Sequence, residues 1–292
     1  MRLGLRLLSL VLVLVVSSCG GYLLLRAAPG DPIDVLLAGA RDPRPERKAE
    51  LQQQFALDRP AIVGAAIWMG GVLRGDLGRS FVDGRPVALR IGERLATTLG
   101  LAALAIALAA ALGLLLGAAA VRRPHGLGLV ISIGYALPVA GLGVAALAFG
   151  APYGALSAIG PAAICLALPL AASAARQIEQ ALAATLRAPF IVTLRARGLD
   201  ESAITRRALR ASLGPAVALL FGQFPALLSG ALVVEILFGV PGLGKLASEA
   251  LYARDYPTVL GLLVVSSVTA LIASWLGDAL RRALDPRLEP SS

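Results

Sequence analysis

The stretch GLGLVISIGYALPVAGLGVAALAFGAPYGALSAIGPAAICLALPLAASAA, residues 126–175, decides the fold class, because it carries no charge over 50 positions. A helix needs about 20 consecutive apolar residues to cross a bilayer, so this stretch has room for two spans. Its middle part, GAPYGALSAIGP (150–161), is rich in Gly and Pro and predicts the turn between them. The apolar runs are continuous and do not alternate with polar residues, which excludes a transmembrane β-barrel.

Four further apolar runs lie on either side of this stretch, and each is long enough for one span. They cover residues 7–25, 95–121, 211–234 and 256–277. The chain of 292 residues is 57% hydrophobic and only 15% charged, whereas soluble domains carry about 25% charged residues. The sequence therefore predicts an all-α, polytopic membrane protein with six transmembrane helices.

The basic residues are distributed unevenly around these six spans. The side that holds both termini carries 14 basic and six acidic residues, whereas the other side carries 13 basic and 12 acidic residues. Cytoplasmic loops are the ones enriched in Lys and Arg, so we expect both termini in the cytoplasm. The net charge of +9 is then a topological signal. Without an aromatic-interleaved basic patch or a DNA-binding motif, it does not indicate a nucleic-acid partner.

The spans divide the chain into four expected parts. These are the first transmembrane helix (1–25), an extracytoplasmic segment with short helices (26–94), a five-helix core with a cytoplasmic loop at 176–213 (95–280), and a cytoplasmic tail (281–292). Within the second part, PERKAELQQQFALD (45–58) predicts an amphipathic helix, and AIVGAAIWMGGVL (61–73) predicts an apolar helix too short to span. RGDLGRSF (74–81) and DGRP (83–86) predict turns.

The N-terminal sequence MRLGLRLLSLVLVLVVSSCGG (1–21) allows two interpretations. Its basic start, apolar centre and small-residue end match a signal peptide, and VSSCG approaches a lipoprotein cleavage box at Cys19. We favour an uncleaved first span, because five further spans follow. The only other cysteine is Cys165 and the only histidine is His125, which argues against a cysteine-ligated metal site or a His-based catalytic site. We expect no catalytic residue, metal or cofactor.

Two motifs lie near the junction of the last two predicted spans. GVPGLGKL (239–246) nearly matches a phosphate-binding loop, but Leu246 stands where Ser or Thr would hold magnesium. We interpret it as an outer turn at Pro241, Gly242 and Gly244. Glu235 ends the fifth span, where a carboxylate is costly and often functional. It either lines a transport pathway or gate, or has a structural role and reaches water at the span end.

The segment RARGLDESAITRRALRASLGP (195–215) lies between the fourth and fifth predicted spans. Gly198 interrupts the helix, Asp200 is a candidate N-cap, and Glu201 favours a helix start. Ile204 and other apolar residues then recur at helical spacing against several Arg, which predicts a short pair of cytoplasmic helices. Such a pair either docks on a cytoplasmic partner and passes its motion to the spans, or lies on anionic lipid.

This segment resembles the cytoplasmic loop of ATP-binding-cassette (ABC) importer permeases of the dipeptide and oligopeptide class. The family pattern T-x-R-A-basic-G-L, followed by R-x-A-L-R and a Pro, is matched by Thr193, Arg195, Ala196, Arg197, Gly198, Leu199, Arg206, Ala208, Leu209, Arg210 and Pro215. Other landmarks follow in the family's order: PGDP (29–32), GDLGRS (75–80), ERLATTL (93–99), PGLGKL (241–246), ARDYP (253–257) and DPRL (285–288). The chain departs from the family at Phe190 and Val192, where more polar residues are expected, and in the short stretch between spans three and four.

The resemblance implies a type I ABC importer-like fold in the bacterial inner membrane. The chain would pair with a second permease as a heterodimer, above two cytoplasmic ATPase subunits and below an extracytoplasmic solute-binding protein. Leu199 and Ile204 would contact an ATPase subunit through apolar groups, with Gly198 at the turn. Arg195, Arg197, Asp200 and Glu201 would supply polar contacts. ATP hydrolysis would take place on the separate subunits, so the chain itself would not be an enzyme.

The resemblance implies di- or oligopeptides as cargo, and it leaves nickel chelates, glutathione and short glycans as alternatives. Two other classes of protein are alternatives to a permease. A membrane-embedded protease is disfavoured because the chain lacks H-E-x-x-H and has a single histidine. An accessory membrane scaffold would differ from a permease in lacking a stoichiometric ATPase partner.

Overall fold

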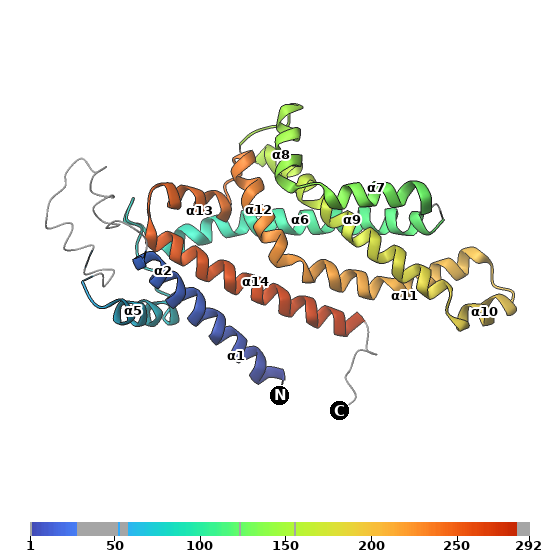
Figure 1. The fold of residues 1–292 in the computed structure, drawn as a ribbon, viewed down its shortest axis with the longest axis horizontal. Helices are drawn as coiled ribbons and strands as arrows, with labels where there is room; N and C mark the ends of the chain where they lie inside the picture. The colour runs from blue at the N-terminus through green and yellow to red at the C-terminus, as the bar shows by residue number, and fades with distance from the viewer. Residues whose placement is uncertain (1, 28–51, 53–57, 123, 155, 285–292) are drawn as a thin grey trace. The chain divides into compact units, whose positions relative to one another are not determined.

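The computed structural model describes residues 2–27, 52, 58–122, 124–154 and 156–284, and these are helical apart from turns and one isolated β-bridge (Figure 1). The expected all-α class is therefore confirmed for the described residues. The PGDP and DPRL motifs lie outside them, as does the predicted amphipathic helix at 45–58 apart from Gln52 and Asp58. The elements are α1 (Arg2–Val15), η1 (Val16–Gly20), α2 (Gly21–Ala27), α5 (Ala61–Leu73), α6 (Val87–Arg122), α7 (Pro124–Ala136), α8 (Val139–Ala148), η2 (Leu156–Ala158), α9 (Ile159–Leu186), α10 (Pro189–Ala196), α11 (Glu201–Gly222), α12 (Phe224–Phe238), α13 (Leu243–Tyr252) and α14 (Tyr256–Leu284).

Between four and six segments of the described chain are long and apolar enough to cross a membrane. Four are single stretches: Leu8–Ala27, Val87–Val121, Ile159–Leu186 and Tyr256–Ala279. Two more arise if each of two broken helix pairs counts as one span, namely Gly126–Ala136 with Val139–Ala148 and Ala226–Phe238 with Leu243–Tyr252. These findings support a multi-pass membrane protein.

The third predicted span is bent by 94° between α7 and α8. Pro138 stands at the bend in an extended conformation, with φ −70° and ψ 134°. Proline has no N–H for the helical ladder and disfavours helical geometry in the residue before it, so the break falls at Leu137 and Pro138. The predicted turn at 150–161 is confirmed in its first half, where Gly150 and Gly154 have positive φ angles.

The fifth span, predicted as continuous over 211–234, is broken. The helix α11 begins at Glu201, continues past Pro215 and ends at Gly222, and α12 begins at Phe224. Gln223 is the N-cap residue of α12, which has proline in its first turn. Pro225 is favoured there because the first N–H groups of a helix have no partner within it. The apolar run is therefore divided between two helices.

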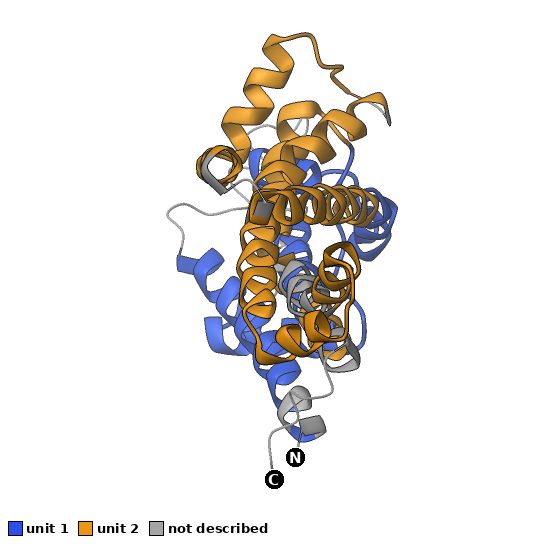
Figure 2. Ribbon diagram, turned by 90° about the vertical axis from the view of Figure 1, so that its right-hand side faces the viewer, with its two compact units in different colours: residues 1–97, 241–271 blue, residues 98–240, 272–292 orange. Residues whose placement is uncertain are grey.

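The chain divides into two compact units, which do not follow the four parts expected from the sequence (Figure 2). Unit 2, residues 98–240 and 272–292, is built around α9, which packs against α7, α8, α11 and α12. Small residues bring these helices close together. A Cβ atom at Gly113 would lie 2.6 Å from the Cβ of Ala174, so α6 and α9 can approach this closely only with glycine there.

Unit 1, residues 1–97 and 241–271, is the blue unit in Figure 2. It has its own core of buried residues. Tyr22 of α2 and Trp68 of α5 are buried in it, together with Val87, Leu246 and Leu260. The predicted short apolar helix at 61–73 is confirmed as α5. It packs against α2 and η1, because its small residues at Gly64 and Ala65 are buried on that side. Exposed apolar residues such as Ile62 and Leu73 cover the rest of α5.

Candidate functional site

The chain turns at Gly198, between α10 and α11 (Figure 1). The N–H of Gly198 donates to the carbonyl of Arg195 at 2.9 Å, and the N–H of Leu199 donates to that of Leu194 at 3.3 Å. Gly198 has φ +75°. These bonds form a Schellman motif, which places glycine in the left-handed conformation after the last helical residues. The predicted helix break at Gly198 is therefore confirmed, and its shape is set by glycine.

The helix α11 begins immediately after this turn. The Asp200 carboxylate accepts a hydrogen bond from the N–H of Ser202 at 3.1 Å and another from the Ser202 hydroxyl. This confirms the predicted N-cap, because a side-chain oxygen satisfies one of the free N–H groups of the first turn. The bonds from Ser202 lower the pKa of Asp200 below its ordinary value.

An ion pair joins the end of α10 to the beginning of α11. The Arg195 guanidinium donates from Nε to Oε1 of Glu201 at 2.6 Å and from Nη2 to Oε2 at 3.2 Å. The hydrogen bond from Arg195 lowers the pKa of Glu201. Both side chains are more than half exposed, so solvent weakens the pair and it adds little to stability. Its two parallel hydrogen bonds give the two exposed side chains a defined orientation at the surface of the turn.

A small apolar core lies beneath the turn. Leu182 of α9, Ile191 of α10, and Ile204 and Ala208 of α11 are buried in it, and Leu194 and Leu199 pack against it. Ile204 was expected to contact a partner, but its side chain has no exposed surface. The sequence reveals the apolar stripe of α11 without revealing that α9 and α10 cover it. Leu199 is half-buried as the apolar residue that follows a Schellman glycine.

Phe190 and Val192 are exposed on α10, with 48% and 66% of their surfaces accessible. Both residues depart from the importer-family pattern that the segment otherwise resembles, in which more polar residues are expected. The side chains of Arg197, Arg206 and Arg207 are also exposed. The outer surface of the turn therefore combines two apolar side chains with several cationic ones.

Glu235 lies in α12 with no exposed surface. The Thr98 hydroxyl of α6 donates to its Oε1 atom at 2.7 Å. Three residues further on, Phe238 is equally buried, and its carbonyl accepts a 2.7 Å hydrogen bond from the N–H of Gly154. In the described conformation, the Glu235 carboxylate is a buried link between two helices of unit 2.

The predicted outer turn follows α12. Gly239 ends that helix in the left-handed region, with φ +67°. Pro241 and Gly242 form the turn, and Gly242 is the N-cap of α13. Gly244, expected in the turn, is instead the second residue of α13 and is buried with Leu243 and Leu246. An apolar, helical setting of this kind differs from the open backbone cradle of a phosphate-binding loop.

Residues 109–290 match the protein family described as the binding-protein-dependent transport system inner membrane component. The chain belongs to this family. The match covers the Gly198 turn and all of α9 to α14, and it confirms the resemblance to ABC importer permeases. The chain is accordingly a multi-pass permease of the bacterial inner membrane.

Curated relatives extend the similarity to the N-terminal part of the permease. The glutathione transport system permease protein GsiC of Salmonella typhimurium is 30% identical, and the alignment covers 97% of each chain. The oligopeptide transport system permease protein AppB of Bacillus subtilis is 27% identical over 92% of each chain. The dipeptide transport system permease protein DppB of Lactococcus lactis is 27% identical over 98% of this chain and 97% of its own.

A buried polar cluster in unit 1 of the permease was not anticipated from the sequence. Asp255 is fully buried immediately before α14. Its carboxylate accepts hydrogen bonds from Ser80 Oγ at 2.5 Å, the Phe81 N–H at 2.9 Å, Arg90 Nη1 at 2.7 Å and Thr258 Oγ1 at 2.7 Å. The sequence shows Asp255 only as part of ARDYP, and its partners Ser80 and Arg90 are more than 160 positions away. We name Ser80, Phe81, Arg90, Asp255 and Thr258 the Asp255 cluster.

The Asp255 cluster holds the loop that precedes α6. This loop follows the predicted turns: Gly75, Gly78 and Gly84 have positive φ angles, and Arg79 forms a β-bridge with Pro86. The carboxylates of Asp76 and Asp83 accept hydrogen bonds from the backbone N–H groups two residues on. The loop therefore has a defined shape, and the Asp255 cluster joins the loop to the start of α14.

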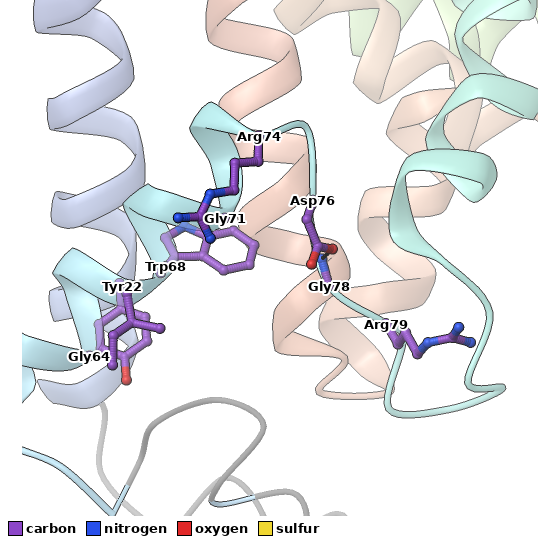
Figure 3. A pocket seen from close by; sticks show the side chains of 9 residues that line it. Tyr22, Gly64, Trp68, Gly71, Arg74, Asp76, Gly78 and Arg79 are labelled. Carbon is purple, nitrogen blue, oxygen red and sulfur yellow. Dashed lines mark hydrogen bonds between the residues drawn. The ribbon is translucent and has the colours of Figure 1, made fainter.

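A pocket of about 350 Å³ lies beside this loop in unit 1. Figure 3 shows Tyr22 and Trp68 on its helical side and Arg74, Asp76 and Arg79 on the segment that follows α5. Aromatic and cationic side chains of this kind are common where a helix meets the membrane surface. Among the described residues, no group of three His, Cys, Asp or Glu side chains could hold a metal ion.

Proposed function

We propose that this permease is one of two membrane subunits of an ATP-driven importer of di- or oligopeptides. The names of its relatives support this cargo, since they are transport permeases for oligopeptides, dipeptides and glutathione. Nickel chelates, glutathione and short glycans are the alternative cargoes. We further propose six spans with both termini in the cytoplasm, on the strength of the excess of basic residues on that side.

The second membrane subunit is a related permease, and the transport path lies between the two. Two cytoplasmic ATPase subunits bind ATP and hydrolyse it, so this chain is not an enzyme. An extracytoplasmic solute-binding protein delivers the cargo. The family description supports a binding-protein-dependent system of this kind.

The Gly198 turn is the proposed docking element for an ATPase subunit. The observation that carries this proposal is the combination of a turn fixed by hydrogen bonds, an outer surface with both polar and apolar side chains, and a buried core below it. We call this outer surface the rim. Arg195, Arg197, Asp200 and Glu201 provide the polar part of the rim. Phe190 and Val192 join Leu199 as apolar contacts, and Ile204 holds the rim in place from below.

The same geometry explains how motion reaches the membrane. The core beneath the turn contains residues of α9, α10 and α11, so a displacement of the turn moves these helices together. A packed core of this kind transmits movement because it has little free volume. Closure of the ATPase dimer would then move a rigid body within this subunit. Glu235 lies in the same unit, and its complete burial supports a structural role in the described conformation.

Two substitutions test the docking proposal. Gly198→Pro removes the N–H that bonds to Arg195 and imposes a negative φ, and Leu199→Asp places a charge at the edge of the small core. We expect both variants to insert and express but to lose ATP-dependent uptake of a labelled tripeptide in proteoliposomes. Gly198→Asn is the matched control, because asparagine retains the N–H and tolerates the left-handed region.

Uptake at the wild-type rate by Gly198→Pro or Leu199→Asp would disprove the assignment. An equal loss of uptake in Gly198→Asn, with all proteins inserted, would show that the backbone conformation is not what matters at this position.

A further inference from the structure

A second pocket, of about 160 Å³, lies within unit 2. The residues that matter to its function are Tyr135, Val139, Pro169, Gln223, Ala226 and Gly230. Its volume is below the roughly 300–1,000 Å³ of sites that enclose a whole small molecule. The pocket can therefore hold one part of a ligand, such as a single side chain.

Three irregularities in the helices meet at this pocket. Tyr135 and Val139 stand on either side of the 94° bend between α7 and α8. Pro169 lies inside α9, where it cannot donate to the carbonyl four residues earlier. Gln223 marks the break between α11 and α12. Non-helical backbone at membrane depth is tolerated where it is buried in protein or lines a water-filled cavity, and interrupted helices form substrate sites in several classes of transporter.

Gln223 lines the pocket with a side chain that can form further hydrogen bonds. Gln223 donates from Nε2 to the Ser173 hydroxyl at 2.7 Å, and Gln177 donates to the same hydroxyl at 3.3 Å. No described residue donates a hydrogen bond to the amide oxygen of Gln223. Its neighbour Gln177 has a buried amide oxygen that likewise has no partner among the described residues. Polar groups inside a membrane bundle usually face its interior or a water-filled cavity, so Gln223 indicates access for a polar ligand.

We propose that this pocket receives one uncharged side chain of a peptide in transit, while the amide oxygen of Gln223 accepts a hydrogen bond from a peptide N–H. The proposal rests on the peptide cargo proposed above. The described lining is apolar apart from Tyr135 and Gln223, and it carries no charged group that could compensate a buried charge. The pocket would therefore favour apolar side chains and exclude charged ones.

Gly230 and Ala226 keep the pocket open. A Cβ atom at Gly230 would lie 3.0 Å from Leu166 and 3.9 Å from Val139, so a side chain there would fill the space between α9 and α12. Ala226 lines the pocket from an exposed position of α12, where a larger side chain can extend into the opening without displacing the core. Ala226→Leu is therefore the variant that narrows the pocket with the least disturbance.

The experiment compares two peptides in the complete importer, with both permeases, the ATPase subunits and the binding protein reconstituted in proteoliposomes. Labelled Ala-Ala-Ala and Ala-Phe-Ala are added outside the vesicles, and ATP is enclosed in the lumen. We expect Ala226→Leu to lower the uptake of Ala-Phe-Ala about tenfold more than that of Ala-Ala-Ala, the size of effect that a methyl or methylene group has in a pocket. Ala145→Leu is the control, an exposed alanine of α8 that does not line the pocket.

A second variant tests the hydrogen bond separately. Gln223→Met keeps the length of the side chain and removes its amide, and we expect it to raise the KM for both peptides several-fold. Ser173→Ala removes the hydroxyl that accepts hydrogen bonds from Gln223 and Gln177 but leaves the Gln223 amide in place, so its effect on the KM should be smaller.

The outcomes separate the two proposals. If the wild-type importer carries neither peptide, the proposed peptide cargo is wrong, and the pocket's assignment falls with it. If the wild-type importer carries both peptides, an equal change in their uptake by Ala226→Leu overturns the proposed role of the pocket and leaves the peptide cargo standing. Loss of the second permease from purified Ala226→Leu complexes would also overturn it, by showing that the pocket is a subunit contact. Uptake that depends on the acyl-chain length of the lipid, and not on which peptide is supplied, would show that lipid occupies the pocket. That result would also overturn the proposal.

Discussion

Two of the Arg–carboxylate pairs in the described part of the permease lie in opposite environments. In unit 1, Arg90 bonds to a fully buried Asp255 that has three further hydrogen-bond donors. In unit 2, Arg195 bonds to Glu201 with 52% and 65% of the two side chains exposed. Burial makes the first pair costly to break, and water makes the second pair nearly neutral for stability. The first pair therefore stabilises the fold, and we propose that the second pair belongs to a surface that a partner recognises.

Removal of the buried carboxylate should have the largest effect on stability. Asp255→Ala leaves Arg90 without its main partner and frees the Ser80 and Thr258 hydroxyls and the Phe81 N–H. Breaking a buried pair in this way typically costs about 3–5 kcal/mol. We expect a large fall in the midpoint of unfolding in detergent, measured by denaturant titration. Asp83→Asn is the control, because Asp83 lies 3.5 Å from Arg90 at a partly exposed position; an equal fall in both variants would contradict the distinction.

Truncation of the core beneath the turn should have the next largest effect. Ile204 is fully buried, so Ile204→Ala should cost about 2–5 kcal/mol in unfolding free energy. Arg207→Ala, three residues along α11 and exposed, should change it by no more than about 0.5 kcal/mol. The same denaturant titration measures both. A small effect at Ile204 would mean that its side chain is available to a partner after all.

The exposed pair should affect transport and leave stability unchanged. Arg195→Ala removes both bonds to Glu201, and we expect no measurable shift in the unfolding midpoint but a several-fold fall in ATP-dependent uptake. Glu201→Gln, which keeps one hydrogen-bond acceptor for Arg195, should lose less uptake than Arg195→Ala. An unfolding midpoint of Arg195→Ala as low as that of Asp255→Ala would contradict the distinction between the two pairs.

A change of pH should have the smallest effect under physiological conditions. The folded pKa values of Asp200 and Glu201 are lowered by Ser202 and Arg195, respectively. Stabilisation from these bonds is therefore present above their ordinary values of about 3.9 and 4.3, and it is lost as pH falls through the lower folded values. We expect hydrogen exchange at residues 198–204, corrected for intrinsic rates, to be constant from pH 6 to 8. Loss of protection within that range would contradict these shifts.

Much of the fold could be predicted because the bilayer makes strong demands on sequence. Apolar runs gave the helical class and the approximate positions of the spans, and Gly198 and Asp200 marked the turn through their local chemistry. The breaks at Pro138 and Gln223 were missed, although Pro138 and Pro225 were visible signals of them. Hydropathy over a long window averages across such breaks.

The remaining features depend on contacts between distant parts of the chain. The helical spacing of Ile204 identified an apolar face but could not say whether the protein or a partner covers it. Asp255 and Arg90 are 165 residues apart, and neither residue is unusual in its own sequence context. Phe190 and Val192 looked like departures from a family pattern, and only their exposure indicates a surface role.

The most direct test of the central claim is quantitative mass spectrometry of the tagged permease purified in mild detergent, wild type beside Gly198→Pro. We predict that the wild type recovers a second permease and two ATPase subunits. We predict that Gly198→Pro retains the second permease and loses the ATPase. Recovery of a folded, monodisperse wild-type chain without any ATPase would contradict the account, and so would equal recovery of the ATPase by the two proteins.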